Sequence, residues 1–173
     1  MDKRWILIFI IIIIAICCGY FVVTHSDSVG KAIVDINKST AVLPPGFSVG
    51  ETESDNIELY QKNAPGKIYI QDLGKKDCGL EELEKRNKSL SKEEDIKIID
   101  INKTVKDDTE LYMLYYQNTS DNESIYYSVS YLYTSYNHTF YIKCSGFDDI
   151  SKIDENLNFL AETIKPDYKK SQE

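Results

Sequence analysis

The chain has 173 residues, which is enough for one domain with a buried core and too few for two domains of ordinary size. It contains 20 basic and 28 acidic residues and has a net charge of −8 at pH 7. Nucleic acids and anionic lipid head groups are bound through cationic patches, so we expect neither as a partner of this acidic chain.

An apolar stretch opens the sequence. No charged residue occurs from Trp5 to Val23, and a helix of that length spans roughly 28 Å, close to the hydrocarbon thickness of a bilayer. The alternative is a cleaved signal peptide, whose apolar part is usually shorter and ends in small residues, whereas this stretch ends in bulky ones. The sequence therefore predicts a retained transmembrane helix whose partner is the lipid bilayer.

Basic residues next to the stretch predict its orientation. Lys3 and Arg4 precede it, and basic flanking residues stay on the cytoplasmic side of a membrane. From Thr24 onward 18 basic and 27 acidic residues remain, so the part outside the membrane would have a net charge of −9. The predicted organisation is a cytoplasmic N-terminus (1–4), a transmembrane helix (5–23), a tether with at most one edge strand (24–40), an extracytoplasmic α+β domain (41–166) and a C-terminal tail (167–173).

A three-stranded meander is predicted at the start of the domain. Two prolines and a glycine between Leu43 and Phe47 force a turn, and alternating residues then predict strands near 47–51, 57–61 and 67–72. In the third strand the isoleucines at 68 and 70 share one face, whereas Tyr69 and Gln71 share the other.

A helix is predicted after Cys78, because the hydrophobic period changes there. Leu80, Leu83 and Leu90 recur at helical spacing, and opposite charges stand four residues apart. The expected exposed ion pairs are Glu81 with Lys85 and Glu82 with Arg86.

Four more strands are expected, at 96–104, 110–117, 124–134 and 139–145, joined by short turns that suit antiparallel hairpins. In the third of these, odd-numbered residues from Tyr127 to Tyr133 face one side and even-numbered residues from Tyr126 to Thr134 face the other.

The last predicted element is an amphipathic helix. Asp148 and Asp149 suit its first turn, where acidic side chains complement the helix dipole and cap free N–H groups. Apolar residues then step by three and four from Ile150 to Ile164, and Pro166 ends the helix.

This order of elements resembles the PsbP-like fold, over about residues 41–166. The phrases that support the resemblance are the proline-glycine turn before Phe47 and a strand from Thr139 to Cys144 that runs into an amphipathic helix. The resemblance implies an α+β fold with a central antiparallel β-sheet of about seven strands and helices on both faces, an α/β/α sandwich. It also implies a family of non-enzymatic binding or assembly factors. Lysine outnumbers arginine eighteen to two, which fits a prokaryotic source with an AT-rich genome.

Acceptor sequences for N-glycosylation are more frequent than expected. Chance predicts about one or two N-x-S/T patterns in this composition, but the chain has six, and an extracytoplasmic glycoprotein is one explanation. The other is that Asn, Ser and Thr gather in turns. The six are Asn37, Asn87, Asn102, Asn118, Asn122 and Asn137.

Two cysteines lie beyond the apolar stretch, Cys78 and Cys144. An even pair in an exported domain suggests one disulfide, which would stabilise the fold by about 4 kcal/mol in the chain-entropy treatment. The alternative is two separate buried thiols.

Thirteen tyrosines are the most unusual feature of the composition. A tyrosine has a large apolar ring and a polar tip, so it suits recognition surfaces and also half-buried strand faces beneath a helix. The first interpretation predicts a binding face for a glycan, a peptide or a partner protein. Its expected members are Tyr112, Tyr116, Tyr126, Tyr131 and Tyr133.

No catalytic or cofactor-binding pattern is evident. The acid pairs at 107–108 and 148–149 fit a turn and a helix cap better than a calcium loop or a general acid and base, and His138 is expected in a solvated turn. Nucleophile, phosphate-loop and zinc-helix motifs are absent, and the histidines and cysteines lack metal-ligand spacing. We expect no cofactor or metal.

The functional prediction is therefore a membrane-anchored, non-enzymatic binding or assembly module on the outer side of the cell membrane, with an envelope protein or glycan as partner. Two alternatives are an extracytoplasmic hydrolase acting on envelope polymers and a structural envelope protein. A cleft that gathers acids or His138 would favour the hydrolase, whereas a flat tyrosine-bearing face would favour the binding module.

Overall fold

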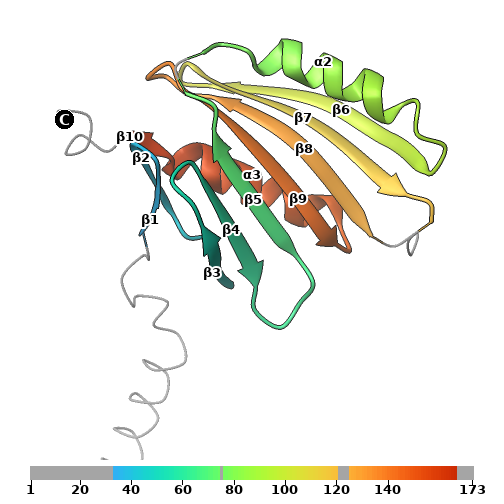
Figure 1. Cartoon of the computed structure of the whole chain (residues 1–173), viewed down its shortest axis with the longest axis horizontal. Helices are drawn as coiled ribbons and strands as arrows, with labels where there is room; N and C mark the ends of the chain where they lie inside the picture. Colours follow the sequence, from blue (N-terminus) through green and yellow to red (C-terminus); the bar gives the residue numbers. More distant parts are fainter. Residues whose placement is uncertain (1–32, 75, 121–124, 167–173) are drawn as a thin grey trace, which may run out of the picture. The chain divides into compact units, whose positions relative to one another are not determined.

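Seven strands form one antiparallel sheet in this computed structural model, which describes residues 33–74, 76–120 and 125–166 (Figure 1). β9 lies between β5 and β8, so it joins the first meander to the second, and the predicted central sheet is confirmed. Across the sheet the order is β3 (Phe47–Thr52), β4 (Asn56–Gln61), β5 (Lys67–Asp72), β9 (Thr139–Phe147), β8 (Tyr126–Tyr133), β7 (Thr109–Asn118) and β6 (Ile96–Lys106).

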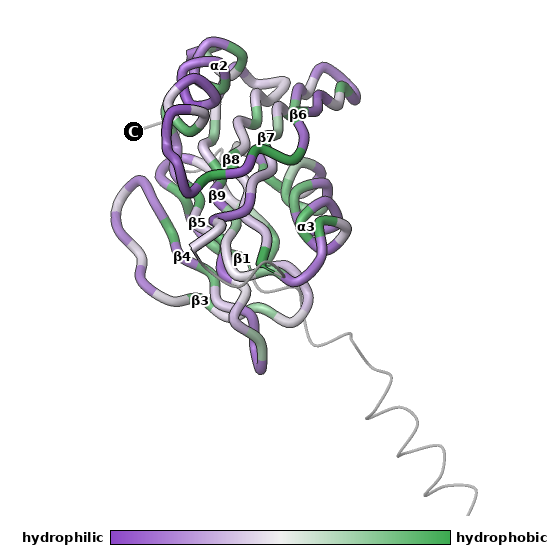
Figure 2. Tube along the Cα trace, turned by 90° about the vertical axis from the view of Figure 1, so that its right-hand side faces the viewer, coloured by the Kyte–Doolittle hydropathy of each residue, from purple (hydrophilic) through white to green (hydrophobic). Residues whose placement is uncertain are grey.

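Two helices cover opposite faces of the sheet, as Figure 2 shows from the side. α2 (Gly79–Leu90) packs on β7 and β8, and α3 (Ile150–Thr163) packs on the other face. Helix, sheet and helix therefore form the three layers that the sequence predicted.

α3 has the cap and the apolar stripe expected from its sequence. The Asp149 side chain accepts a hydrogen bond of 2.9 Å from the backbone N–H of Ser151 and so satisfies one free donor of the first turn. Ile153, Leu157 and Leu160 are completely buried against the sheet. Burying each of these side chains stabilises the fold by roughly 1.5–3 kcal/mol.

α2 contacts the sheet through fewer leucines than its sequence predicted. Leu83 and Leu90 are buried, but Leu80 is 52% exposed. The first turn approaches the sheet through Gly79 instead, where an added Cβ would lie 2.9 Å from the ring of Tyr112. Leu80 therefore points to solvent, and the sequence-based assignment of Leu80 to the apolar stripe is wrong.

A second, three-stranded sheet occupies part of the predicted tether. β1 (Ile33–Ile36) and β2 (Ser39–Val42) form a hairpin, and β10 (Lys165–Pro166) pairs with the other side of β2. Val34, Ile36 and Ala41 from this hairpin belong to the main core. Residues 33–40 thus belong to the folded unit, whereas the sequence predicted that the domain begins at residue 41.

Within the described residues, no helix has the length and apolar character needed to cross a bilayer. The predicted transmembrane helix at 5–23 and the predicted tail at 167–173 lie outside those residues.

Candidate functional site

The five tyrosines expected to form a binding face do not share an exposed surface. Tyr112, Tyr116 and Tyr131 are each only 6% exposed and pack beneath α2. Tyr126 packs against the core on the opposite face, and Tyr133 is half-buried at the end of β8. The predicted binding face is therefore wrong, and the alternative of tyrosines packed beneath a helix describes three of its five members.

A different row of tyrosines lies on the uncovered part of the same face. Tyr60 on β4, Tyr69 on β5 and Tyr141 on β9 belong to three successive strands, and the ring centroids of Tyr69 and Tyr141 are 6.1 Å apart. In Figure 1 the described helices leave the front of β3, β4 and β5 uncovered. The row therefore crosses an open sheet face and ends beside the buried Tyr131, 5.5 Å from Tyr141.

Two adjoining hollows lie along the part of this row formed by Tyr69 and Tyr141, each of about 290 Å³, and Tyr141 lines both. We call the two hollows together the tyrosine trough. Glu58, Lys67, Tyr69, Lys143 and Ser145 line the first hollow, and Gln71, Leu73, Glu82, Arg86 and Tyr131 line the second. The trough thus combines aromatic rings with hydrogen-bonding groups and has three cations against two carboxylates in an otherwise acidic chain.

The ring of Tyr60 is fixed at the outer end of the row. An added Cβ at Gly50 would lie 1.9 Å from the Tyr60 ring, so only glycine leaves room for the ring to lie over β3. Lys67 Nζ lies 5.0 Å from the ring centroid, a cation–π contact. The Tyr60 hydroxyl donates to Glu58, and this hydrogen bond raises the pKa of Tyr60. These contacts hold the ring in one orientation before any ligand binds.

Arg86 stands at the other end of the trough and is not paired as predicted. Glu81 does pair with Lys85, at 2.8 Å, but Glu82 also contacts Lys85, at 3.0 Å. The buried Nε of Arg86 has no hydrogen-bond partner among the described residues. The predicted Glu82–Arg86 ion pair is therefore wrong, because Glu82 contacts the lysine three residues further on.

The two cysteines are free and buried in the structure, so the predicted disulfide is not formed. Cys78 immediately precedes α2, whereas Cys144 belongs to the core beneath α3. The sheet separates them, which excludes a bond without rearrangement of the core. Burial raises the pKa of the Cys144 thiol to about 12 and keeps it protonated.

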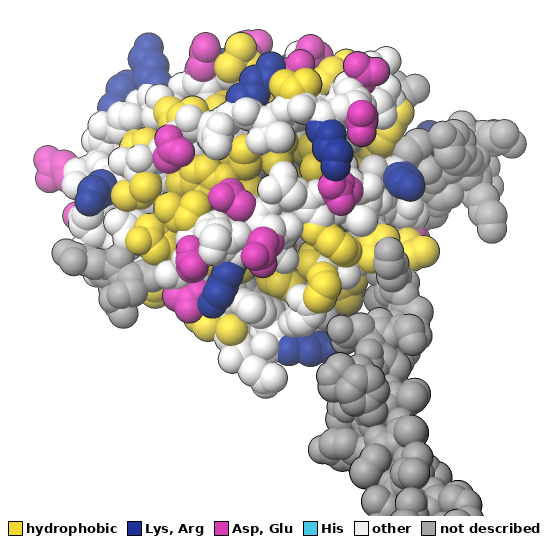
Figure 3. Space-filling view, turned by 180° about the vertical axis from the view of Figure 1, so that it is seen from behind, with side chains coloured by type: hydrophobic (Ala, Val, Ile, Leu, Met, Phe, Trp, Pro, Cys, Tyr) yellow, Lys and Arg dark blue, Asp and Glu magenta, His cyan; other side chains and the backbone are white. Residues whose placement is uncertain are grey.

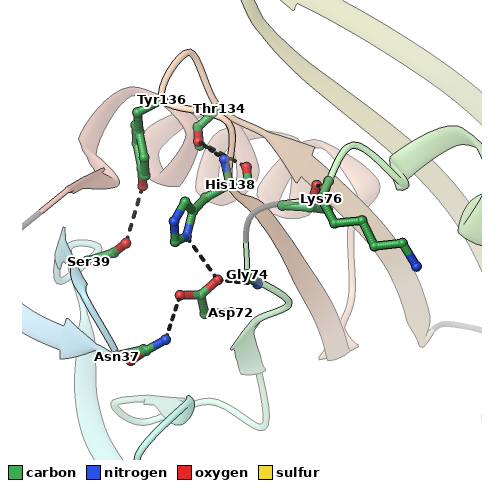
Figure 4. A network of polar contacts seen from close by, with 9 residues as sticks. Asn37, Ser39, Asp72, Gly74, Lys76, Thr134, Tyr136 and His138 are labelled. Atoms are coloured by element: carbon green, nitrogen blue, oxygen red, sulfur yellow. Dashed lines mark hydrogen bonds and ion pairs between the residues drawn. The ribbon is translucent and has the colours of Figure 1, made fainter. Parts of the chain in front are cut away.

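His138 is buried rather than solvated, which corrects the sequence-based expectation (Figure 4). Its Nδ1 lies 3.2 Å from Oδ1 of the buried Asp72, and Oδ2 of Asp72 accepts a hydrogen bond of 3.1 Å from Nδ2 of Asn37. Nearby, the Tyr136 hydroxyl donates to Ser39 Oγ over 3.5 Å. These contacts attach the β1–β2 hairpin to the seven-stranded sheet, so we interpret the His138–Asp72 pair as structural.

A larger cleft of about 440 Å³ lies on the α3 face, between the β6–β7 turn, the β8–β9 turn and the end of α3. Hydrophobic side chains form a band across this face in Figure 3. Lys106 and Glu162, which line the cleft, pair with each other at 2.6 Å, and the Thr134 hydroxyl donates to the His138 carbonyl. Because these polar groups are already satisfied, the tyrosine trough is the stronger candidate site.

The predicted glycosylation sites occupy different environments. Nδ2 of Asn37 is used in the bond to Asp72, whereas Asn102 lies in the middle of the exposed strand β6. Asn37, Asn102 and Asn137 are exposed, Asn87 and Asn118 are half-exposed, and Asn122 lies outside the described residues.

The acid pairs have the structural roles expected from the sequence. Asp107 and Asp108 form the β6–β7 turn with positive φ angles of 47° and 60°, and Asp148 pairs with Lys152 at 2.7 Å beside the Asp149 cap. In the described part of the chain, no three His, Cys, Asp or Glu side chains gather as a metal site would require.

The strand order and the helix on each face define an α+β sandwich of the PsbP-like type. Among solved structures, the fold is similar to the solution structure of cyanobacterial PsbP (CyanoP) from Synechocystis sp. PCC 6803, with a TM-score of 0.50 and 11% sequence identity over 82% of this chain and 96% of that chain. No protein-family model matches the sequence, and no curated protein matches it either. The similarity confirms the predicted fold, and at this identity it shows the fold alone.

Proposed function

We propose that this chain is a membrane-anchored, non-enzymatic binding module that holds a glycan chain of the cell envelope in its tyrosine trough. The observation that supports this proposal is the open row of Tyr60, Tyr69 and Tyr141 across three neighbouring strands. The fixed ring of Tyr60 supports it further, because a preorganised surface loses little entropy on binding.

The chemistry of the trough suits a glycan better than a peptide. Peptides that bind sheets commonly add a strand to an edge, but the trough is a sheet face whose backbone groups are already paired. Recognition must therefore use side chains, and C–H groups of sugar rings stack on aromatic faces while their hydroxyls bond to groups such as Gln71 and Ser145.

The location is part of the same proposal. The apolar stretch at 5–23 and the basic residues before it support an anchor with the domain outside the cell. The chain should stay with membranes after alkaline carbonate extraction, and protease added to intact cells should digest the domain. A domain that survives such protease would contradict the extracytoplasmic location.

Binding can be tested with the full chain in detergent and polysaccharide extracted from the envelope of the source cells. Tyr69→Ser should weaken binding by roughly tenfold, about 1.4 kcal/mol, because it removes a half-buried ring that lines the trough at the centre of the row. Tyr126→Ser is the matched control, since that ring packs on the opposite face of the sheet. Both variants should keep the native circular dichroism spectrum. Equal binding by Tyr69→Ser and wild type would contradict the proposed use of the trough.

A further inference from the structure

Arg86 is the one arginine of the chain beyond the apolar stretch. The chain has only two arginines, Arg4 and Arg86, and its other eighteen basic residues are lysines. A guanidinium differs from an ammonium because it is planar and offers parallel N–H groups that match the two oxygens of a carboxylate or phosphate. Arg86 lines the inner hollow beside Tyr131, a member of the buried tyrosine cluster.

The surroundings of Arg86 leave part of its guanidinium unsatisfied. The Nε atom is buried and has no hydrogen-bond partner among the described residues. Burial raises the pKa values of Tyr116, Tyr131 and Tyr141, and the positive charge of Arg86 acts against this rise at all three. Arg86 lines the same hollow as Tyr131 and Tyr141, so it borders the tyrosine cluster at the end of the trough.

The expected partner of this cation contacts another residue. Glu82 lines the same hollow, but its carboxylate lies 3.0 Å from Lys85 Nζ. A buried N–H group of a charged side chain without an acceptor costs free energy, and an incoming oxyanion would remove that cost. Nε–H and a neighbouring Nη–H together can donate two parallel hydrogen bonds to such a group.

We propose that Arg86 binds an oxyanion of the ligand, a carboxylate or a phosphate group, at the inner end of the tyrosine trough. This inference rests on the proposed function, because it specifies the chemistry of the glycan bound there as anionic. Lys67 and Lys143 place two more cations along the outer hollow. The acidic charge elsewhere does not prevent binding, because physiological salt screens exposed charges beyond about 8 Å.

The polymer test uses the full chain and three samples of envelope polysaccharide: untreated, carboxyl-reduced and dephosphorylated with hydrogen fluoride. Wild type should bind the untreated sample at least tenfold more tightly than one of the treated samples, and the treatment that weakens binding identifies the oxyanion. Arg86→Gln should lose this preference. Arg86→Lys should retain only part of it, because an ammonium lacks the parallel N–H groups of a guanidinium. Lys88→Gln, an equal change of charge at an exposed position of α2, should retain it.

A second measurement does not depend on the polymer. With only two arginines, the ¹⁵N-labelled chain has two Nε–H signals to assign, and that of Arg86 should shift saturably with sodium acetate or sodium phosphate but not with equal sodium chloride. A saturable shift without polymer binding would leave the anion site standing and overturn the proposed function. Absence of a shift, equal binding of all three polymer samples, or an unchanged preference in Arg86→Gln would overturn the anion site alone.

Discussion

Asp72 and His138 are 66 residues apart in sequence, yet Oδ1 of the carboxylate lies 3.2 Å from Nδ1 of the imidazole in a buried environment. The same carboxylate accepts hydrogen bonds from the backbone N–H of Gly74 at 2.7 Å and from Nδ2 of Asn37 at 3.1 Å. One side chain on β5 therefore fixes the turn before β9 and the turn of the β1–β2 hairpin.

Replacing Asp72 with alanine should lower the free energy of unfolding by about 3 kcal/mol, because the buried His138 ring and the N–H groups of Asn37 and Gly74 lose their shared partner together. Urea unfolding of the full chain in detergent would measure the change. Glu84→Ala, an exposed change on α2, is the control and should stay within about 0.5 kcal/mol of wild type. An Asp72→Ala variant as stable as this control would show that the buried contacts contribute nothing.

Stability should fall at alkaline pH. Burial raises the pKa of Cys144 from 9.0 to about 12, so the thiol stays protonated in the folded state while it ionises above pH 9 in the unfolded chain. The free energy of unfolding is therefore unaffected by this group below about pH 9 and falls between pH 9 and 12, by up to about 1.4 kcal/mol per pH unit. Burial also raises the pKa of Tyr131, to about 12, which adds to the loss above pH 10.

Urea unfolding at pH 7.5, 9 and 10.5 tests this prediction. Cys144→Ala removes the thiol and should reduce the slope above pH 9, although it also costs some packing at every pH. An identical slope in wild type and Cys144→Ala would exclude the thiol as its source.

Strand β6 forms an edge of the seven-stranded sheet and has two exposed apolar residues, Ile101 and Val105. Side-chain oxygens of Asp100 and Asn102 accept hydrogen bonds from the next backbone N–H groups, at 2.9 and 2.8 Å. Such local bonds make an edge less available to another strand. The double variant Asp100→Ala, Asn102→Ala should therefore associate with further copies of itself through β6.

Sedimentation velocity at increasing protein concentration would measure this association. Glu94→Ala with Asn158→Ala, which removes one charge and one amide from exposed positions elsewhere, should not change the oligomeric state. If the two double variants sediment alike, the side-chain hydrogen bonds of Asp100 and Asn102 do not prevent association through β6.

Glycan attachment should differ among the predicted acceptor sites. Nδ2 of Asn37 is bound to Asp72, and the hydroxyl-bearing Ser39 of its acceptor sequence is completely buried. In the sequence at Asn102, both the asparagine and Thr104 are exposed. We therefore expect carbohydrate at Asn102 and none at Asn37 in chains modified after folding, as peptide mass spectrometry of protein from native membranes would show. A glycan at Asn37 would contradict this prediction.

Much of the fold could be predicted because its signals are local. Alternation such as that of Ile68 and Ile70 marks a strand wherever the strand lies in the sheet, and the apolar steps of α3 mark a helix with one buried side. The small sheet was missed because β2 pairs with β10, more than a hundred residues later, through only two residue pairs. The burial of His138 was missed for the same reason, since Asp72 is distant in sequence.

The candidate site was predictable only in part. The alternation around Tyr69 already placed its ring on the sheet face opposite the buried isoleucines, and this signal could have identified Tyr69 as a tyrosine outside the core. Which tyrosines α2 covers depends on how that helix crosses the sheet, and no local pattern specifies the crossing. Whether Arg86 is paired likewise depends on whether Glu82 contacts Lys85 or Arg86. The spacing in the sequence allows both contacts and does not decide between them.

β2 is held between β1 and β10, so the first and last described strands meet in one small sheet. Mechanical tension entering the fold at Ile33 would act first on the ladder between β1 and β2 and on the hydrogen bond from Asn37 to Asp72. The strands that carry Tyr60, Tyr69 and Tyr141 belong to the seven-stranded sheet and take no part in the pairing between β1 and β2. Under strain, the hairpin would yield before the tyrosine-bearing surface is deformed.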